Sequence, residues 1–316
     1  MSEPIVSIII CTCNRAAHLR QTLAALAGLC VPEALPTELI VVDNASTDDT
    51  AQVVQQCRLP NMPVRYIQEP KRGQCFARNT GIATAKGEII LFTDDDVRPP
   101  QNWIAGMCGP ILQGEADAVA GGVKIAPHLE REWMKHEHRC WLACTDWIET
   151  PVAQSMVGAN MAFSKAVLTK VSGFDTELGP GALGFYDETL FAWQLKEAGF
   201  RIAAALDLAV DHHFEVSRLQ RRNFQATAEK YGRSSAYVAY HWEHRDVTRS
   251  MLKFLKRRLR LLFWRTQNRQ KRLAPDGMDW WEFELIKEAN FFRHYARLQG
   301  QPRNYAKRGL EKLRHG

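Results

Sequence analysis

Short apolar runs alternate with amphipathic stretches along the first part of the chain. The runs are rich in Val and Ile and shorter than typical helices, which is the pattern of strands buried on both faces. They are VSIIICT (6–12), ELIVVDN (38–44), VRYIQE (64–69), EIILFTDDD (88–96) and DAVAGGVK (117–124). Helical periodicity separates them at 17–28, 48–57, 73–85 and 100–113. Strands that alternate with helices predict βαβ connections, and therefore an α/β fold with a mainly parallel sheet flanked by helices.

The pattern becomes mixed after residue 113. We expect helices at 128–144 and 187–199, a strand pair or a strand and loop in SMVGANMAFSK (155–165), and a last core strand in ALDLAVDHH (205–213). From about residue 217 the sequence becomes helical. We therefore predict two parts, an α/β domain over 1–216 and a basic helical extension over 217–316.

One stretch of the extension, MLKFLKRRLRLLFWR (251–265), is strongly amphipathic. A helix here would gather its large apolar residues on one face and basic residues on another. The apolar face holds Met251, Leu252, Leu255, Leu259, Leu262 and Phe263, and the other face holds Lys253, Lys256, Arg257 and Arg260. Such a helix suits an anionic membrane surface, and Trp264, Trp280 and Trp281 suit the same interface. The alternatives are packing of the apolar face on the rest of the protein and nucleic-acid binding, for which no recognisable module is present.

Composition places the chain among ordinary globular proteins, with 46% hydrophobic and 24% charged residues in 316. The net charge of +6 conceals a division. Residues 1–216 carry 17 Lys and Arg against 26 Asp and Glu (−9), and residues 217–316 carry 24 against 9 (+15). A basic extension of this kind predicts an anionic partner. The chain start has neither a basic n-region nor a cleavage site, and no apolar run is long enough to span a bilayer, so we expect a cytoplasmic protein.

Polar residues collect where the predicted strands end, which is where parallel α/β sheets bind their ligands. They are Thr12, Asn14 and Arg15 after the first strand, Asp43 and Asn44 after the second, and Asp94, Asp95 and Asp96 after the fourth. Three adjacent carboxylates repel one another, and a divalent cation such as Mg²⁺ or Mn²⁺ relieves the repulsion while binding substrate phosphates. A helix-capping cluster and an aspartate nucleophile are the alternative interpretations of the triplet.

The ordered motifs resemble those of the family 2 glycosyltransferases, which have the Rossmann-like GT-A fold and use nucleotide-diphospho-sugars. The resemblance covers roughly residues 4–215. The motifs are SIIICTCNR, ELIVVDNASTDDT, GQCFARNTGI, GEIILFTDDDV, VGANMAFSK, SGFDTELGPG, DETLFAWQLKEAGF and AVDHHF. Each is weak alone, and the set in this order is specific.

The resemblance implies roles for individual residues. The donor pocket would contain Thr12, Asn14, Arg15, Asp43, Arg78, Asp94 and Asp95. Asp96 is expected to bind the metal, with Asp95 as the alternative, and His212 falls where many members place a histidine near the metal. The family's catalytic base lies in a Glu-Asp pair; here the order is inverted, so Glu188 is the base by register and Asp187 remains possible. Gly158 and Asn160 match a loop on the acceptor side.

The implied activity is inverting, Mn²⁺- or Mg²⁺-dependent transfer of a sugar, with a UDP-sugar as the favoured donor. A glycan or lipid-linked acceptor is expected, in cell-surface polysaccharide or glycolipid assembly at the cytoplasmic face of a membrane. The alternatives are a sugar-phosphate nucleotidylyltransferase and a non-catalytic membrane-associated scaffold.

Two other sequence patterns give little evidence of a functional site. GPGALG (179–184) follows no strand and is interpreted as a loop beside the site, and the spacing of His136, Cys140 and Cys144 is typical of helix packing rather than zinc.

Overall fold

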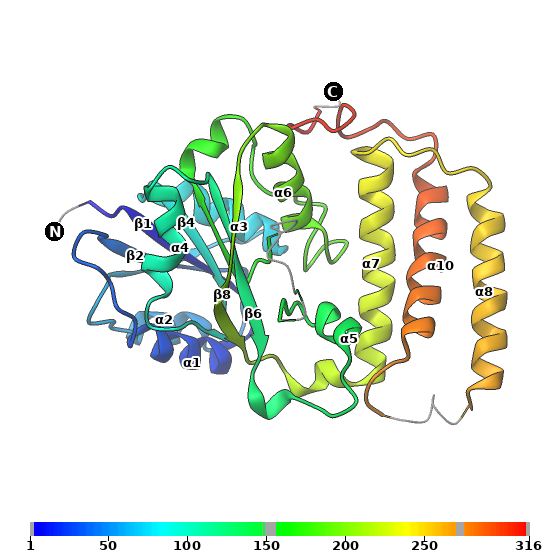
Figure 1. Cartoon of the computed structure of the whole chain (residues 1–316), viewed down its shortest axis with the longest axis horizontal. Coiled ribbons are helices and arrows are strands. Elements are labelled where there is room, and N and C mark those ends of the chain that lie inside the picture. The colour runs from blue at the N-terminus through cyan, green and yellow to red at the C-terminus, as the bar shows by residue number, and fades with distance from the viewer. Residues whose placement is uncertain (1–2, 147, 149–155, 270–274, 314–316) are drawn as a thin grey trace.

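An eight-stranded sheet with the order β3-β2-β1-β4-β7-β6-β8-β5 forms one side of the molecule (Figure 1). The computed structural model describes residues 3–146, 148, 156–269 and 275–313. The strands are β1 Val6–Thr12, β2 Thr37–Asp43, β3 Val64–Gln68, β4 Ile89–Asp94, β5 Val97–Arg98, β6 Ala118–Ile125, β7 Asn160–Ser164 and β8 Ile202–His212. Each strand predicted from the first five apolar runs is confirmed within two residues at either end.

Most strands run in one direction. The strands β1 to β4 pair in parallel, and so do β6 and β8, while β7 runs antiparallel between β4 and β6. The carboxyl ends of β1, β2, β4, β6 and β8 therefore meet at one edge of the sheet. The short β5 pairs antiparallel with the end of β8 and brings the residues after β4 to that edge.

Helices cover both faces of the sheet. The helices in the described residues are α1 Ala16–Leu26, α2 Thr50–Gln56, α3 Gln74–Thr84, α4 Trp103–Leu112, α5 His136–Trp141, α6 Asp187–Glu197, α7 Arg221–His241, α8 Ser250–Gln267 and α10 Trp280–Leu298, and the last three of these lie beside the sheet rather than on a face of it. Alternate residues of β1 face opposite ways: Ile8 packs in a core with Leu19 and Leu23 of α1, and Ile9 packs in another with Ile82 of α3. Burial on both faces explains why the strands are continuously apolar.

The expected helix at 128–144 is wrong in extent. A 3-10 turn spans Pro127–Leu129, and α5 occupies only His136–Trp141. The chain leaves the helix at Leu142, and Ala143 has a φ of 65°, a left-handed conformation that a helix cannot continue through. Within 155–165 the strand β7 covers only Asn160–Ser164 and follows a turn, which is the strand and loop expected there, and Ser155 lies outside the described residues.

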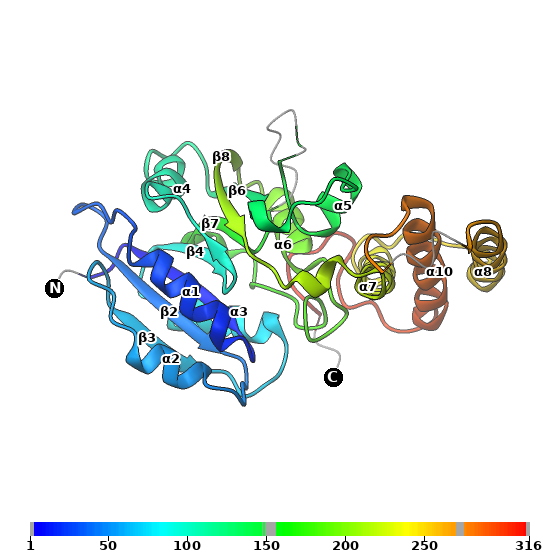
Figure 2. The ribbon, with the colours of Figure 1, turned by 90° about the horizontal axis from the view of Figure 1, so that it is seen from below.

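The C-terminal helices form a row beside the sheet, in the order α7, α10, α8 from the sheet outward (Figures 1 and 2). Phe224 of α7 and Phe283 of α10 share a core with Trp141 of α5, and the rings of Trp141 and Phe283 stack at 3.7 Å. The chain then returns to α6, where Gln194 Nε2 donates hydrogen bonds to the carbonyls of Gly309 and Leu310, at 3.2 Å each.

Candidate active site

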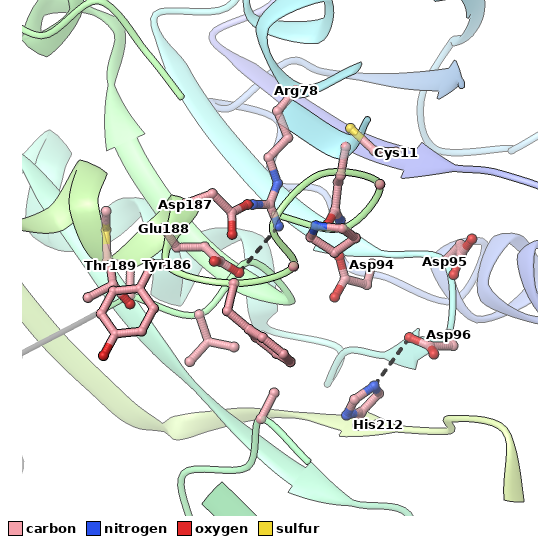
Figure 3. A pocket seen from close by; sticks show the side chains of 18 of the residues that line it. Cys11, Arg78, Asp94, Asp95, Asp96, Tyr186, Asp187, Glu188, Thr189 and His212 are labelled. Atoms are coloured by element: carbon pink, nitrogen blue, oxygen red, sulfur yellow. Dashed lines mark hydrogen bonds and ion pairs between the residues drawn. The ribbon is translucent and has the colours of Figure 1, made fainter. Parts of the chain in front are cut away.

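A cavity of about 1110 Å³ opens at the carboxyl edge of the sheet, between the strand ends and the N-terminus of α6. Figure 3 shows two groups of charged side chains in it, with Asp94 and Asp96 on one side and Glu188 on the other. The loop of GPGALG contributes Pro180, Gly181 and Gly184 to the lining, as expected of a loop beside the site.

The middle aspartate of the triplet ties the end of β4 to the end of β1. Asp95 accepts a hydrogen bond from the Thr12 hydroxyl at 2.7 Å, and its other carboxylate oxygen lies 3.3 Å from Nε of Arg15. Its backbone carbonyl accepts a bond from Thr22 on α1, also at 2.7 Å. Burial raises the pKa of Asp95 to about 7 in spite of Arg15. All three aspartates line the cavity, and these contacts engage both carboxylate oxygens of Asp95 with the end of β1 and Arg15 (Figure 3).

The pairing of β5 with β8 places Asp96 against His212. Val97 lies opposite His212 in the register, and the backbone N–H of His213 donates to the Asp96 carbonyl at 2.7 Å. Asp96 Oδ1 is 3.5 Å from Nε2 of His212, and Asp96 Oδ2 is 2.6 Å from Arg15. Burial would raise the pKa of Asp96, but His212 and Arg15 outweigh it and hold that pKa well below its ordinary value. Asp96 is therefore an anion that cationic and imidazole groups surround.

Arg218 is a site residue that the sequence analysis missed. It follows β8 in a 3-10 turn, Val216–Leu219, and lines the cavity with its Nη1 atom 3.4 Å from Nε2 of His212. Its guanidinium carbon lies 5.2 Å from the Phe214 ring centroid. Burial lowers the pKa of Arg218, and nearby Asp96 opposes the shift. Arginines pair well with diphosphates, but one arginine in a basic stretch gives no signal of its own in the sequence.

Arg78 and the two acids of α6 form the other charged group. Arg78 on α3 is almost fully buried and contacts Asp187 through Nη1, and its Nη2 lies 3.5 Å from Glu188 Oε1. Asp187 is 1% exposed at its side chain, whereas Glu188 is 23% exposed. Tyr186, at a φ of 72°, turns the chain into the helix, so that both acids occupy the first turn and face the positive end of its dipole.

These neighbours shift the pKa values of the two carboxyl groups in opposite directions. Burial and the adjacent Glu188 raise the pKa of Asp187 well above its ordinary value, with Arg78 opposing the rise. Burial would raise the pKa of Glu188 as well, but Arg78 and hydrogen bonds outweigh it and lower that pKa. Glu188 is therefore the carboxylate that is both ionised and open to the cavity.

Gly158 lets the chain approach this pair closely. Its N–H donates to Glu188 Oε1 at 3.1 Å. A Cβ atom at this position would lie 1.9 Å from Nη2 of Arg78 and 2.8 Å from Glu188 Oε1. Any larger residue would therefore displace the two charged side chains, and this gives Gly158 a positioning role.

Asn160 does not reach the cavity. It is fully buried, its side-chain oxygen accepts a bond from Trp103 Nε1 at 2.8 Å, and its amide donates to the carbonyls of Gly122 and Leu208. The expected acceptor contact is thus replaced by a structural one, because Asn160 begins β7 with its side chain turned between β6 and β8.

Asp43 and Asn14 shape the loops after β2 and β1. Asp43 is buried and accepts bonds from the Ser46 N–H at 2.9 Å and the Tyr66 hydroxyl at 2.7 Å. Asn14, with a φ of 54°, accepts a bond from the Thr47 N–H at 2.7 Å. Their neighbours Cys13 and Asn44 line the cavity, so these contacts fix the wall next to them.

Asp96 and His212, with Asp94 beside them, are the residues able to hold a divalent cation. Over the described residues, no three Asp, Glu, His or Cys side chains converge as a metal site. His136, Cys140 and Cys144 therefore do not form one either. A protein-only cage is not required, since Mg²⁺ and Mn²⁺ sites of this type take one or two carboxylates and complete their shell with phosphate oxygens and water. His212 Nδ1 is buried with no hydrogen-bond partner in the described part of the chain.

The fold is that of the GT-A glycosyltransferases. A mannosyltransferase from Pyrobaculum calidifontis, solved in complex with GDP-Man and Mn²⁺, superposes with a TM-score of 0.56 at 20% identity, over 95% of this chain and 71% of its own. TarS 1–349 of S. aureus, in complex with UDP, gives a TM-score of 0.51 at 16% identity, over 94% of this chain and 92% of its own. The model of the glycosyl transferase family 2 matches residues 7–171, and the chain belongs to this family.

Curated relatives in the family have similar sequences over part of their length. Glycosyltransferase AglE of Haloferax volcanii is 33% identical over 39% of this chain, and the succinoglycan biosynthesis protein ExoM of Rhizobium meliloti is 29% identical over 56%. The matches span 40% and 60% of these relatives, so the chain corresponds to about half of their length.

Proposed function

We propose that the protein transfers a sugar from a nucleotide-diphospho-sugar to an acceptor hydroxyl, with inversion at the anomeric carbon. The observation that carries the proposal is the placement of two charged groups across one cavity, Asp94 and Asp96 with His212, and Glu188 with Arg78. An inverting displacement requires a base on the side opposite the leaving diphosphate, and the separation of these groups supports such an arrangement.

The donor diphosphate would lie at the strand edge. Arg15 and Arg218 bring guanidinium groups to Asp96, where they can pair with phosphate oxygens. Asp96 and His212, with Asp94, would hold Mn²⁺ or Mg²⁺, and the ion when bound supplies positive charge to the leaving diphosphate. Asp96 rather than Asp95 suits this role because Asp96 lies beside His212, whereas Asp95 is bonded to Thr12 at the end of β1. A UDP-sugar is the favoured donor, and the GDP-Man and UDP in the two superposed structures are ligands of the same class.

Glu188 would remove the proton from the acceptor hydroxyl. Its carboxylate is ionised, open to the cavity and fixed by the N–H of Gly158. General-base assistance of this kind accelerates a reaction about 10²- to 10⁴-fold. Asp187, buried against Arg78, would position that arginine and through it Glu188.

We place the reaction in polysaccharide or glycolipid assembly at the cytoplasmic face of a membrane. The relatives support an assembly role, since one of them is a succinoglycan biosynthesis protein. The acceptor would be a glycan or a lipid-linked saccharide.

A thermal-shift screen of nucleotide sugars with and without Mn²⁺ tests the proposal. A ligand that binds the folded state raises the apparent melting temperature, so the true donor should stabilise the protein in the presence of the metal. The stabilising donor is then incubated with candidate acceptors. Release of the nucleoside diphosphate and an inverted anomeric signal in the product are expected. Release of pyrophosphate would identify a nucleotidylyltransferase, and stabilisation without any turnover would identify a non-catalytic protein.

A further inference from the structure

The helix α8 shows its apolar face to the outside of the molecule. The six large apolar residues that share that face are 46% to 67% exposed: Met251, Leu252, Leu255, Leu259, Leu262 and Phe263. The helix forms the outer edge of the C-terminal row, beyond α10 (Figures 1 and 2). We name these six residues the α8 face. A contiguous exposed stripe of this size marks an interaction surface.

The opposite side of α8 contacts α10 partly through ion pairs. Arg257 contacts Glu288, and Nε of Arg265 lies 2.9 Å from Oε1 of Glu282. Leu261 is buried between the helices. The helix is therefore inverted relative to an ordinary surface helix, which packs its apolar side inward. Packing against the protein, one of the alternatives considered for this sequence, does not cover the α8 face.

Exposed basic residues flank the α8 face. Lys256, Arg258 and Arg260 are exposed, and the sequence of α8 contains no acidic residue. At 100° per residue, Lys256 and Arg260 fall on one side of the face and Arg258 on the other. Two exposed tryptophans, Trp280 and Trp281, begin α10 at the end of the row where α8 finishes (Figure 1).

This pattern of apolar and basic residues favours one kind of partner over the others. A second copy of the chain would bring two basic helices together with no acid on either, and the like charges would oppose dimerisation. A nucleic acid would pair with the basic residues but offers nothing to a stripe of Leu and Phe. An anionic lipid surface suits both the apolar and the basic residues, because the acyl chains surround the apolar side chains and the headgroups pair with the flanking Lys and Arg. None of the helices in the described ranges has the length and hydropathy to span a bilayer.

We propose that α8 is a membrane-docking helix that lies in the plane of an anionic bilayer, with the α8 face inserted among the acyl chains. The surface is separate from the cavity, so the proposal stands or falls independently of the reaction. It also deepens the proposed function, since a docked enzyme would receive lipid-linked acceptors without their leaving the membrane.

Co-sedimentation of the whole protein with vesicles tests the proposal. The probes are vesicles of phosphatidylcholine alone and of phosphatidylcholine mixed with phosphatidylglycerol. We expect binding to the mixed vesicles only, weakened by added salt. The double variant L259E/F263E should bind at least about tenfold more weakly, because the carboxylates would have to enter the acyl region. The triple variant K256Q/R258Q/R260Q should bind about a hundredfold more weakly.

The matched control is Leu112→Glu, which alters a leucine that is 50% exposed on α4. This variant should bind as the unaltered protein does, and all variants should keep its melting temperature, since the altered side chains are exposed. Equal binding by L259E/F263E and the unaltered protein would overturn the proposal, as would failure of the unaltered protein to bind mixed vesicles. A dimer in light scattering that becomes a monomer in L259E/F263E would assign the α8 face to a second copy instead.

Discussion

Arg78 contacts Asp187 and Glu188 at once, yet only one of the two acids is open to the cavity. Its Nη1 contacts Asp187, which is 1% exposed, while its Nη2 lies 3.5 Å from Glu188, which is 23% exposed. One guanidinium thus holds both carboxylates, and the difference in exposure separates the acid that can meet a substrate from the acid that holds the arginine.

Replacing Glu188 and replacing Asp187 should have different effects. Glu188→Gln should lower kcat about 10²- to 10⁴-fold, because the amide cannot accept the proton, while the donor KM and the melting temperature stay unchanged. Asp187→Asn should instead lower the free energy of unfolding by about 1 to 3 kcal/mol, since buried Arg78 loses one of its two carboxyl partners. Steady-state kinetics and urea unfolding of both variants measure this. If Asp187→Asn loses turnover without losing stability, Asp187 is the base.

Asp96 should be essential for donor turnover but not for folding. In Asp96→Ala, the carboxylate between His212 and Arg15 is lost, so we expect Mn²⁺-dependent stabilisation by the nucleotide sugar to disappear with activity. The matched control is Asp211→Ala, an exposed aspartate near the end of β8, which should leave both unchanged. Full activity of Asp96→Ala in the presence of EDTA would contradict the proposed site.

Arg218 should contribute to donor binding. Arg218→Gln removes a cation that lines the cavity beside His212, and we expect the donor KM to rise about tenfold, the loss typical of one charge-assisted hydrogen bond. Arg222→Gln, at an exposed arginine in the first turn of α7, is the matched control. Equal KM values for the two variants would remove Arg218 from the donor site.

Gly158→Ala should reduce activity by displacing Arg78 and Glu188, although it removes neither side chain. The added Cβ would overlap Arg78 Nη2 at 1.9 Å, so the arginine and Glu188 must both move. A displacement of this order lowers kcat about 10²-fold. Gly28→Ala is the control, because a Cβ there meets its nearest neighbour at an ordinary 3.5 Å. A Gly158→Ala enzyme with unaltered kcat would show that the pair can shift without cost to the reaction.

Asp175 should make stability depend on acid pH. Its carboxylate accepts bonds from the hydroxyls of Tyr237 at 2.6 Å and Tyr305 at 2.8 Å, and pairs with Lys312. Burial raises its pKa, but Lys312 and the hydrogen bonds outweigh burial and lower the pKa below its ordinary value. The contribution of Asp175 is then complete above the unfolded-state pKa of about 4 and is lost as the pH falls below it.

The corresponding variant is Asp175→Asn. Its free energy of unfolding at neutral pH should be about 2 kcal/mol lower than that of the unaltered protein, and the difference should shrink as the pH falls below about 4. Urea unfolding across this range measures the difference, with exposed Asp207→Asn as the control. A constant difference over the whole range would show that the charge of Asp175 does not matter.

The sequence predicted the strands because their signal is local. A run such as VSIIICT is apolar at every position, and only a strand covered on both faces explains that pattern. It also predicted that Asp94 and Asp96 lie where the parallel strands end, since that follows from the direction of the chain.

The remaining features depend on contacts between distant segments. The antiparallel course of β7 turns Asn160 toward Trp103 instead of the cavity, and no periodicity in a five-residue strand reveals this. Arg218 reaches His212 only because β8 ends beside β5. The apolar stripe of 251–265 was evident from spacing, but its outward direction follows from Glu282 and Glu288 on a helix further along the chain.

The return of residues 303–313 to α6 has a consequence for how the protein is made. Gln194 on the helix that begins with Asp187 and Glu188 binds the carbonyls of Gly309 and Leu310, and Asp175 binds Tyr305 and Lys312. These partners lie more than a hundred residues beyond Asp187 and Glu188 in the sequence, so they leave the ribosome later. A nascent chain can therefore form most of its sheet during translation, but the helix that carries the acids acquires its last supports only once that late segment has emerged.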